Sequence, residues 1–296
     1  QKGRRFFMYG VVNLKRWLRV TAAAVLAVGV LGVFGALLRV FAADSGVQVP
    51  VIMYHAVIDD SGRLGRYVIS PAELESDFSW LQSHGYTAVL SEDLLRYVED
   101  GTPLPEKPVL ITFDDGYYNN YRYAFPAAKR YGMRFVLSPI GKCADLYTEE
   151  PSESQYYAHC TWEMMREMQD SGVVEIGNHT YDLHSSDGSR LGTRRLSTES
   201  MEAYREMLCE DVNLFQKKAE ENLGRAPVLF AYPFGAVSEG EPEIIASLGF
   251  SVTLSCEERI STVTRDPESL VYLGRFLRPS GETSEAFFSR MLGGAG

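Results

Sequence analysis

The chain has 296 residues, of which 45% are hydrophobic and 23% are charged. Its 15 Phe and 17 Tyr residues exclude a disordered or collagen-like chain, because so many large apolar side chains require a buried core. Residues 40–296 carry 22 basic and 39 acidic residues, a net charge of −17. Phosphate polymers would be repelled by such a body, so we expect no binding to nucleic acid.

The N-terminal segment is basic and then apolar. Its only charged residues are Lys and Arg, and Val20–Leu38 is a run of nineteen uncharged residues. About twenty such residues span a bilayer as a helix, and the positive-inside rule places the basic end in the cytoplasm. We therefore expect a cytoplasmic tail over 1–19, a single transmembrane signal anchor over 20–40 and a linker over 41–48. The rest of the chain would then lie outside the cytoplasmic membrane of a bacterium.

A cleaved signal peptide is the alternative interpretation of this segment. Cleavage near Ala42, at the end of the run Val40-Phe41-Ala42, would release a secreted protein. The apolar run is longer than the core of a usual signal peptide, which favours the anchor. A buried soluble helix is disfavoured because the run has no polar face at a 3.6-residue period.

Strands and helices are predicted to alternate along the body of the chain. Short apolar runs predict strands, and a capping residue followed later by a glycine predicts a helix. The clearest helix start is at Ser70, where Pro71 takes the first helical position and Glu73 completes a capping box. The predicted strands are Val49–Tyr54, Tyr86–Leu90, Pro108–Phe113, Met133–Pro139, Val173–Gly177, Val228–Tyr232 and Phe250–Leu254. The predicted helices are Ser70–His84, Ser91–Glu99, Asn120–Tyr131, Thr161–Ser171, Thr198–Leu223 and Glu241–Leu248.

This alternation indicates an α/β domain, with a parallel sheet or barrel inside and helices outside. Residues 47–290 contain no linker rich in Gly, Ser or Pro and no internal repeat, so we expect one domain. In such folds the reactive groups lie at the carboxyl ends of the strands. Four predicted strand ends carry such groups: His55, the pair Asp114-Asp115, the pair His179 and His184, and the turn Pro233-Phe234-Gly235.

One carboxylate and two imidazoles are the usual ligands of a catalytic zinc site, which keeps a further position for water. A second carboxylate nearby can accept a proton from that water. Asp114 and Asp115 would point to opposite faces of a strand, but a turn at Gly116 lets both reach one site. His179 and His184 do not share a helical face, so they must converge from a loop.

The cysteines indicate no zinc site, because none of them has the CxxC spacing. In an exported domain they could form disulfides, but the sequence leaves the pairing open. The four residues are Cys143, Cys160, Cys209 and Cys256.

Three groups of residues resemble the motifs of the polysaccharide deacetylases of carbohydrate esterase family 4. They are Thr112-Phe113-Asp114-Asp115-Gly116, His179-Thr180 with His184, and Tyr232-Pro233-Phe234-Gly235. The resemblance covers nearly all of 49–278 and implies a catalytic domain over 49–290 with a distorted (β/α) barrel. It also implies removal of N- or O-acetyl groups from sugars with a divalent metal, Zn²⁺ first and Co²⁺ or Mn²⁺ as alternatives.

The same resemblance implies a role for each motif residue. Asp114 would be the catalytic base, and Asp115, His179 and His184 the metal ligands. The backbone N–H of Phe234 would donate to the oxyanion that forms during hydrolysis. Three further residues are expected to bind substrate: Leu183, Tyr232 and Pro233.

The motifs depart from the common family pattern in three ways. The two histidines are five positions apart instead of four, no arginine precedes the Pro-Phe pair, and no histidine follows His184 to supply the general acid. These departures resemble the branch that deacetylates exported poly-β-1,6-N-acetylglucosamine, in which an early Tyr-His pair supplies the acid. Tyr54-His55 matches that pair, so the resemblance implies that His55 is the general acid. The alternative is that His55 only orients a neighbour.

The resemblance thus implies a metal-dependent enzyme that removes N-acetyl groups from extracellular or cell-wall polysaccharide containing N-acetylglucosamine. Peptidoglycan, chitin oligomers or O-acetylated xylan are alternative substrates, and a non-catalytic glycan-binding relative is an alternative function. A non-haem iron oxygenase is disfavoured because Asp115 and His179 are far apart in sequence. A glycosidase is disfavoured because its two carboxylates must flank a sugar bond. The sequence identifies no protein partner.

Overall fold

The structure is a computed structural model that describes residues 46–186 and 190–293. The predicted cytoplasmic tail and transmembrane anchor lie outside these residues, as does most of the predicted linker. Gly46–Gly296 forms one compact unit. Within 46–186 and 190–293, no helix combines the length and the apolar character needed to cross a membrane.

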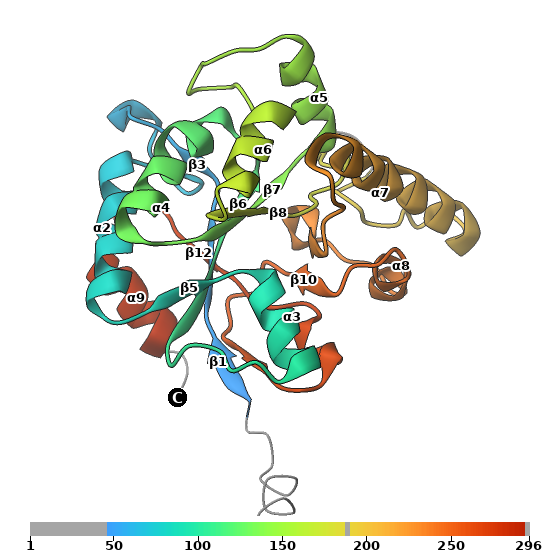
Figure 1. Cartoon of the computed structure of the whole chain (residues 1–296). Helices are drawn as coiled ribbons and strands as arrows, with labels where there is room; N and C mark the ends of the chain where they lie inside the picture. The colour runs from blue at the N-terminus through green and yellow to red at the C-terminus, as the bar shows by residue number, and fades with distance from the viewer. Residues whose placement is uncertain (1–45, 187–189, 294–296) are drawn as a thin grey trace, which may run out of the picture. The chain divides into compact units, whose positions relative to one another are not determined.

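A parallel sheet forms the centre of the unit Gly46–Gly296 (Figure 1), which confirms the predicted α/β class. Five of its strands are hydrogen-bonded in the order β12 (Phe276–Leu277), β2 (Val51–Tyr54), β6 (Pro108–Asp115), β7 (Phe135–Pro139) and β8 (Val174–Ile176). The sixth strand, β5 (Thr87–Val89), pairs with the first residues of β6. All these pairs are parallel, so the carboxyl ends of the strands meet at one edge of the sheet.

Shorter pairings continue from β8 round to β12. Asn178 forms a bridge to Phe230 in β9 (Leu229–Ala231), and β9 pairs in parallel with β10 (Val252–Leu254). Leu254 then forms a bridge to Leu273, three residues before β12. The ladder is therefore an irregular ring, in which single bridges replace long strands on one side.

The remaining short elements lie around this ring. β1 (Val47–Val49) pairs in antiparallel fashion with β11 (Ser261–Val263), and β3 (Ala56–Val57) pairs in parallel with β4 (Val68–Ile69). Three 3₁₀ turns complete the connections: η1 (Ser61–Arg63), η3 (Pro233–Gly235) and η4 (Pro267–Leu270).

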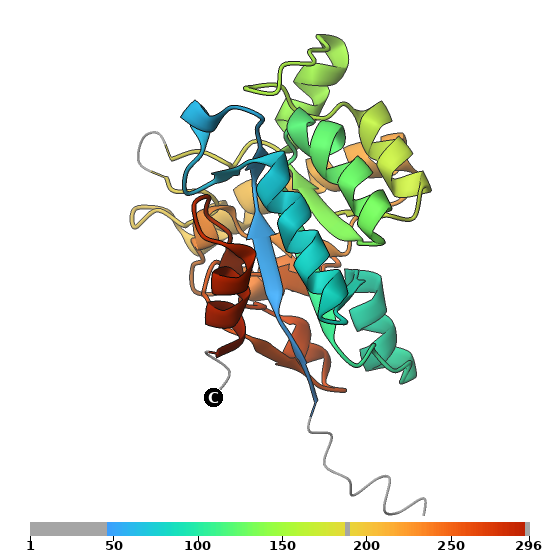
Figure 2. The ribbon, with the colours of Figure 1, turned by 90° about the vertical axis from the view of Figure 1, so that its left-hand side faces the viewer.

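Helices cover the outside of the sheet (Figures 1 and 2). One group in contact consists of α9 (Ser284–Gly293), α2 (Pro71–Ser83) and α4 (Phe125–Tyr131). A second consists of α5 (Gly141–Glu149), α6 (Trp162–Asp170) and α7 (Met201–Leu223). The other two helices are α3 (Ser91–Asp100) and α8 (Glu241–Ser247).

The capping box at the start of α2 is confirmed. Ser70 Oγ accepts from Glu73 N at 3.2 Å, and the Glu73 carboxylate accepts from Ser70 N at 2.8 Å.

Two helices, α5 and α9, were not predicted from the sequence. Helix α5 has no side-chain cap, because its first N–H groups donate to the carbonyl oxygens of Thr180 and Tyr181. Partners that lie so far along the chain leave no local signal.

The predicted helix over Asn120–Tyr131 begins with a π-helical turn, η2 (Asn120–Ala124), which runs into α4. Pro126 in the first turn of α4 has no N–H, so it cannot donate to the carbonyl four residues earlier. Phe125 N instead donates to Asn120 O, five residues back. Such π-turns often occur at functional sites.

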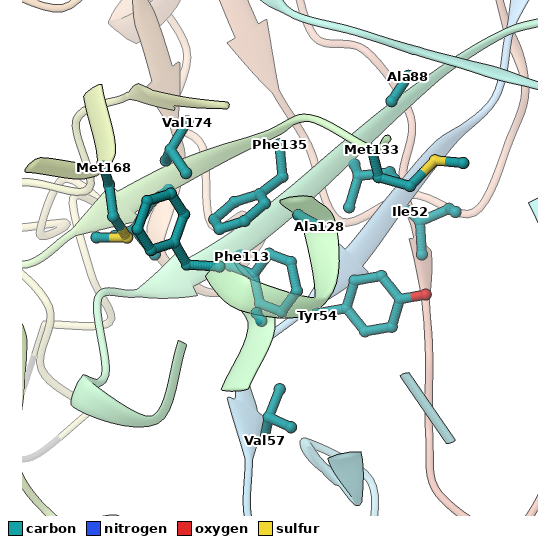
Figure 3. Packing of buried hydrophobic residues seen from close by; sticks show 14 of the residues in the cluster. Ile52, Tyr54, Val57, Ala88, Phe113, Ala128, Met133, Phe135, Met168 and Val174 are labelled. Carbon is teal, nitrogen blue, oxygen red and sulfur yellow. The ribbon is translucent and has the colours of Figure 1, made fainter. Parts of the chain in front are cut away.

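Large apolar side chains fill the space between the sheet and the helices α2, α4 and α6. Figure 3 shows the rings of Tyr54, Phe113 and Phe135 side by side in this cluster. The ring centroids of Tyr54 and Phe113 are 4.9 Å apart, and those of Phe113 and Phe135 are 4.8 Å apart. This core holds the strands that end in the predicted reactive residues.

A buried ion pair joins the last strand to this core. Arg278, directly after β12, contacts both carboxylate oxygens of Asp77 on α2, at 2.8 and 3.1 Å. The same carboxylate accepts from Tyr54 Oη at 3.0 Å and from Ser284 Oγ at 2.6 Å. One carboxylate thus ties together β12, α2, β2 and the start of α9.

Arg278→Met should destabilise the fold by about 3–5 kcal/mol, because the Asp77 charge would stay buried without its partner. Urea unfolding followed by tryptophan fluorescence measures this loss. The double variant Asp77→Leu/Arg278→Met should recover part of it, since no orphan charge remains. Arg130→Met removes an exposed guanidinium of the same size and should change the free energy of unfolding by under about 1 kcal/mol. A similarly small effect of Arg278→Met would contradict this role for the pair.

Candidate metal and catalytic site

A cavity of about 450 Å³ opens among the carboxyl ends of the strands. All six residues predicted for catalysis and metal binding line it: His55, Asp114, Asp115, His179, His184 and Phe234. Glu258, Arg66 and Tyr67 line it as well. Residues that are up to 179 positions apart in sequence therefore share one space, as their places at strand ends predicted.

The last two residues of β6 reach the cavity by different means. Asp114 lies in regular strand, in register with Ser138 of β7. Asp115 has a left-handed backbone, with φ of 68°, and Gly116 follows with φ of 76°. These two residues reverse the chain, so the Asp115 side chain turns back to the side of Asp114. A Cβ on Gly116 would lie 2.5 Å from the Cβ of Pro139, which is why glycine stands there.

The two histidines converge on Asp115. His179 Nδ1 lies 2.7 Å from the carbonyl oxygen of Ala231, so it carries the proton and leaves Nε2 with a free lone pair. His179 Nε2 is 3.6 Å from Asp115 Oδ1, and His184 Nε2 is 3.3 Å from the same oxygen. Asn178 fixes the loop between them, because its Oδ1 accepts from Thr180 N at 2.7 Å.

These three residues fit a divalent cation. Their ligand atoms all lie within 4.8 Å of one another. Asp115 Oδ1 is buried and, within the described part of the chain, accepts no hydrogen bond. A carboxylate and two neutral imidazoles leave room for water, as in catalytic zinc sites, and the set also suits cobalt or manganese.

Burial adjusts the charge of these ligands. It lowers the pKa of His179 to about 3 and also lowers the pKa of His184, so both imidazoles are neutral near pH 7. It raises the pKa of Asp115 to about 6. Neutral imidazole and ionised carboxylate are the forms that bind a metal.

Arg275 is the main residue that the sequence analysis missed. Its Nη1 lies 2.7 Å from Asp114 Oδ1, and both side chains are buried. Burial pushes the pKa of Asp114 upward, but the charge and hydrogen bond of Arg275, together with His179 and His55, outweigh burial and hold this pKa well below its usual range. Asp114 is therefore ionised at any physiological pH. The guanidinium that pairs with Asp114 thus comes from the residue just before β12.

A local signal for Arg275 does exist in the sequence. Gly274-Arg275-Phe276-Leu277 is a short apolar segment with one charged residue, and a charge within a buried strand requires a partner. The choice of Asp114 as that partner depends on the ring of strands. It could not be read from the spacing of 161 residues.

The turn η3 presents Phe234 to the cavity. Phe234 has a left-handed backbone, with φ of 59°, and its ring centroid lies 4.5 Å from that of His184. The N–H groups of Gly235 and Ala236 donate to the carbonyl oxygens of Tyr232 and Pro233. Since Pro233 has no N–H, the Phe234 N–H is the turn's remaining donor.

The three residues predicted to bind substrate lie elsewhere: Leu183, Tyr232 and Pro233 are not among those that line the cavity. Tyr232 is fully buried, with its ring against Phe230, and Pro233 is buried beside it. Leu183 packs on the same cluster of apolar side chains. The part of these three residues in substrate binding stays a prediction.

His55 follows β2 and lines the cavity half-buried, with its ring against Tyr67. Two buried asparagines at the start of the π-turn hold its backbone. Asn120 Nδ2 donates to His55 O at 2.7 Å, and Asn119 Oδ1 accepts from Val57 N at 2.9 Å. The sequence analysis missed both asparagines, because their inward direction results from the π-turn.

All four cysteines are free thiols. Cys256 lines the cavity, with its Sγ 3.7 Å from Arg275 Nη2. None of the four belongs to the candidate metal centre among the described residues.

Metal affinity should depend on pH through Asp115. Below its pKa of about 6 a proton competes with the metal for this carboxylate, while His179, with a pKa of about 3, stays neutral. We expect a constant Zn²⁺ affinity above about pH 7 and a loss of up to tenfold per pH unit below about pH 6. Competition with a chromophoric chelator measures this. Asp115→Ala should abolish tight binding at every pH, and equal affinity at pH 5 and pH 7 would contradict the assignment.

Comparison with protein families matches residues 101–253, just over half of the chain, to the family described as polysaccharide deacetylase. The poly-β-1,6-N-acetyl-D-glucosamine N-deacetylase of Escherichia coli strain K12 is 26% identical over 234 residues. That match covers 72% of this chain but only 34% of the E. coli protein. The chain thus spans about a third of the length of this relative.

Two solved structures share the fold. A de-N-acetylase from Aggregatibacter actinomycetemcomitans matches with a TM-score of 0.71 and 25% identity, over 83% of this chain and all of the other. IcaB from Ammonifex degensii matches with a TM-score of 0.66 and 28% identity, over 83% of this chain and 97% of the other. The α/β fold, the candidate metal ligands and the matched residues lead to one conclusion: this chain belongs to the polysaccharide deacetylase family.

Proposed function

We propose that this protein hydrolyses N-acetyl groups on an N-acetylglucosamine polysaccharide of the poly-β-1,6-linked type. The observation that carries the proposal is the buried Asp114–Arg275 pair beside the ligand set Asp115, His179 and His184 in one cavity. A permanently ionised carboxylate next to a metal site is what hydrolysis of an amide requires. The choice of polymer rests on the name of the E. coli relative.

Asp115, His179 and His184 would hold the metal, which we propose to be zinc, with cobalt or manganese as alternatives. A divalent metal there supplies Lewis acidity toward a water molecule and toward the acetyl carbonyl. Asp114 takes the proton of the attacking water as general base, and Arg275 keeps its carboxylate charged and oriented. Because Asp114 does not bind the metal in this scheme, a mutation of Asp114 can separate proton transfer from metal binding.

The remaining steps use Phe234 and His55. The Phe234 N–H donates a hydrogen bond to the acetyl oxygen as negative charge develops on it. His55 gives a proton to the nitrogen as the C–N bond breaks, which releases acetate and leaves an amine on the sugar. The asparagine contacts to His55 O and to Val57 N support this role, because a general acid must be held in place.

We also propose that the catalytic domain, residues 49–290, acts outside the cytoplasmic membrane. The uncharged run Val20–Leu38 and the basic residues before it support a single-pass anchor. Secretion after cleavage near Ala42 is the alternative.

Acetate release tests the reaction. The full-length chain, in mild detergent because of its apolar run, is stripped of metal, reloaded with Zn²⁺, Co²⁺ or Mn²⁺, and given four polymers. These are poly-β-1,6-N-acetylglucosamine, peptidoglycan, chitin oligomers and acetylated xylan. We expect metal-dependent acetate from the first. Asp114→Asn should cut the rate by about 10²–10⁴-fold at unchanged metal content.

The matched control is Asp266→Asn, which makes the same change at an exposed turn and should keep full activity. If only another polymer releases acetate, the proposed substrate is wrong and the proposed deacetylation still holds. Full activity of Asp114→Asn would refute the proposed base. A chain that binds metal and releases no acetate from any polymer would instead be a glycan-binding relative.

Asn120→Ala removes the donor to His55 O and should let the proposed acid shift. We expect kcat to fall about 10- to 100-fold, since a displacement near 1 Å can cost that much, with KM and Zn²⁺ affinity within about twofold. Steady-state acetate kinetics and chelator competition measure the three quantities. Asn222→Ala is the control, because it removes a comparable side-chain bond at the end of α7. An equal loss of metal affinity would mean that Asn120 supports the whole site and not His55 alone.

A further inference from the structure

Glu258 is a carboxylate of the cavity wall that the proposed mechanism does not use. Four residues that line the cavity carry a formal charge: Arg66, Asp114, Asp115 and Glu258. Arg275 neutralises Asp114, and Asp115 belongs to the candidate metal centre. Glu258 faces the same space and has no part in either.

The position of the Glu258 carboxylate is fixed on one side. Its Oε1 accepts from the backbone N of Leu277 in β12 at 3.3 Å, and its Oε2 lies 3.2 Å from Arg290 Nη1 on α9. The side chain is still 46% exposed, so part of the carboxylate remains open to a ligand. A carboxylate held this way loses little further side-chain entropy when it binds.

The wall around Glu258 carries an excess of negative charge. Arg290 also pairs with Glu282, at 3.1 Å, so two carboxylates share one guanidinium. Glu257, the neighbour of Glu258, pairs with Arg259 at 3.4 Å, which leaves that pair neutral.

Arg66, from the segment between β3 and β4, contributes a positive charge to the lining. Its guanidinium lies 5.4 Å from the ring centroid of Tyr67. Among the residues that the structure describes, no carboxylate forms an ion pair with it within 4 Å, Glu258 included. A cationic group in the cavity would therefore be attracted toward Glu258 and repelled from Arg66.

We propose that Glu258 binds the ammonium group of a glucosamine unit next to the sugar that reacts. The inference rests on the proposed function, since that reaction converts a neutral acetamide into an amine that is cationic near neutral pH. The acidic wall would then recognise the product of one turnover as part of the substrate for the next. The enzyme accordingly prefers a polymer that is already partly deacetylated.

Two pentamers of β-1,6-linked N-acetylglucosamine test this in the full-length, Zn²⁺-loaded chain: one fully acetylated, one with a single internal glucosamine. The measured quantity is kcat/KM for acetate release. Wild type should prefer the cationic pentamer, and Glu258→Gln should remove about two- to fivefold of that preference, the range of partly exposed ion pairs. Glu258→Lys should reverse the preference. Raising NaCl to 0.5 M should reduce the difference in wild type.

Glu257→Gln and Glu257→Lys make the same charge changes one residue away, outside the cavity lining, and should keep the wild-type preference. A second readout is the Kd of the fully deacetylated glucosamine pentamer, measured by calorimetry, which Glu258→Gln should weaken by a similar factor. An unchanged preference and an unchanged Kd in Glu258→Gln would overturn the inference. If neither pentamer releases acetate while Kd still responds to Glu258, the proposed reaction fails and the ammonium site stands.

Discussion

The buried contact between Asp114 and Arg275 is the interaction on which the site depends. An isolated carboxylate at that depth would take up a proton, because burial disfavours its charge. Arg275 keeps it ionised, and Thr112 Oγ1, 3.4 Å from the same guanidinium nitrogen, helps to hold that group. The partner lies 161 residues later in the sequence, directly before β12, so Asp114 gains this counter-ion only when β12 has joined β2.

Backbone shape is the second constraint. Three residues in or beside the site have left-handed φ values although they carry side chains: Asp115 and Phe234, which line the cavity, and Thr180, which follows His179, at 68°, 59° and 71°. Each such residue costs free energy and persists only where surrounding contacts fix it. The strand partner of Asp115, the Asn178 side chain and the η3 turn provide those contacts. Contacts outside the cavity thus stabilise a strained backbone that places Asp115, His179 and Phe234 around one space.

Features that depend on neighbouring residues in the sequence could be predicted from the sequence. The capping box at Ser70, the order of strands and helices, and the convergence of Asp114, Asp115, His179 and His184 all follow from short-range signals and from the parallel sheet. The sequence did not predict the roles of Arg275, Asn119 and Asn120, because their partners are more than sixty residues away. The inward direction of the Tyr232 ring could not be read from its motif, because it depends on packing against distant parts of the core.

The alternation of side chains along β12 links two parts of the molecule. Arg275 faces the inside of the ring and pairs with Asp114. Arg278 faces the helices around the ring, where it pairs with the buried Asp77. Asp77 also accepts from Ser284 at the start of α9. Both counter-ions therefore stand within four residues near the carboxyl end. A ribosome delivers Asp77 and Asp114 about 160 to 200 residues before it delivers these arginines. Until then both carboxylates must stay hydrated or protonated, so a nascent chain cannot close its centre early. A chain that has not yet reached Arg275 thus lacks the counter-ion that keeps Asp114 charged.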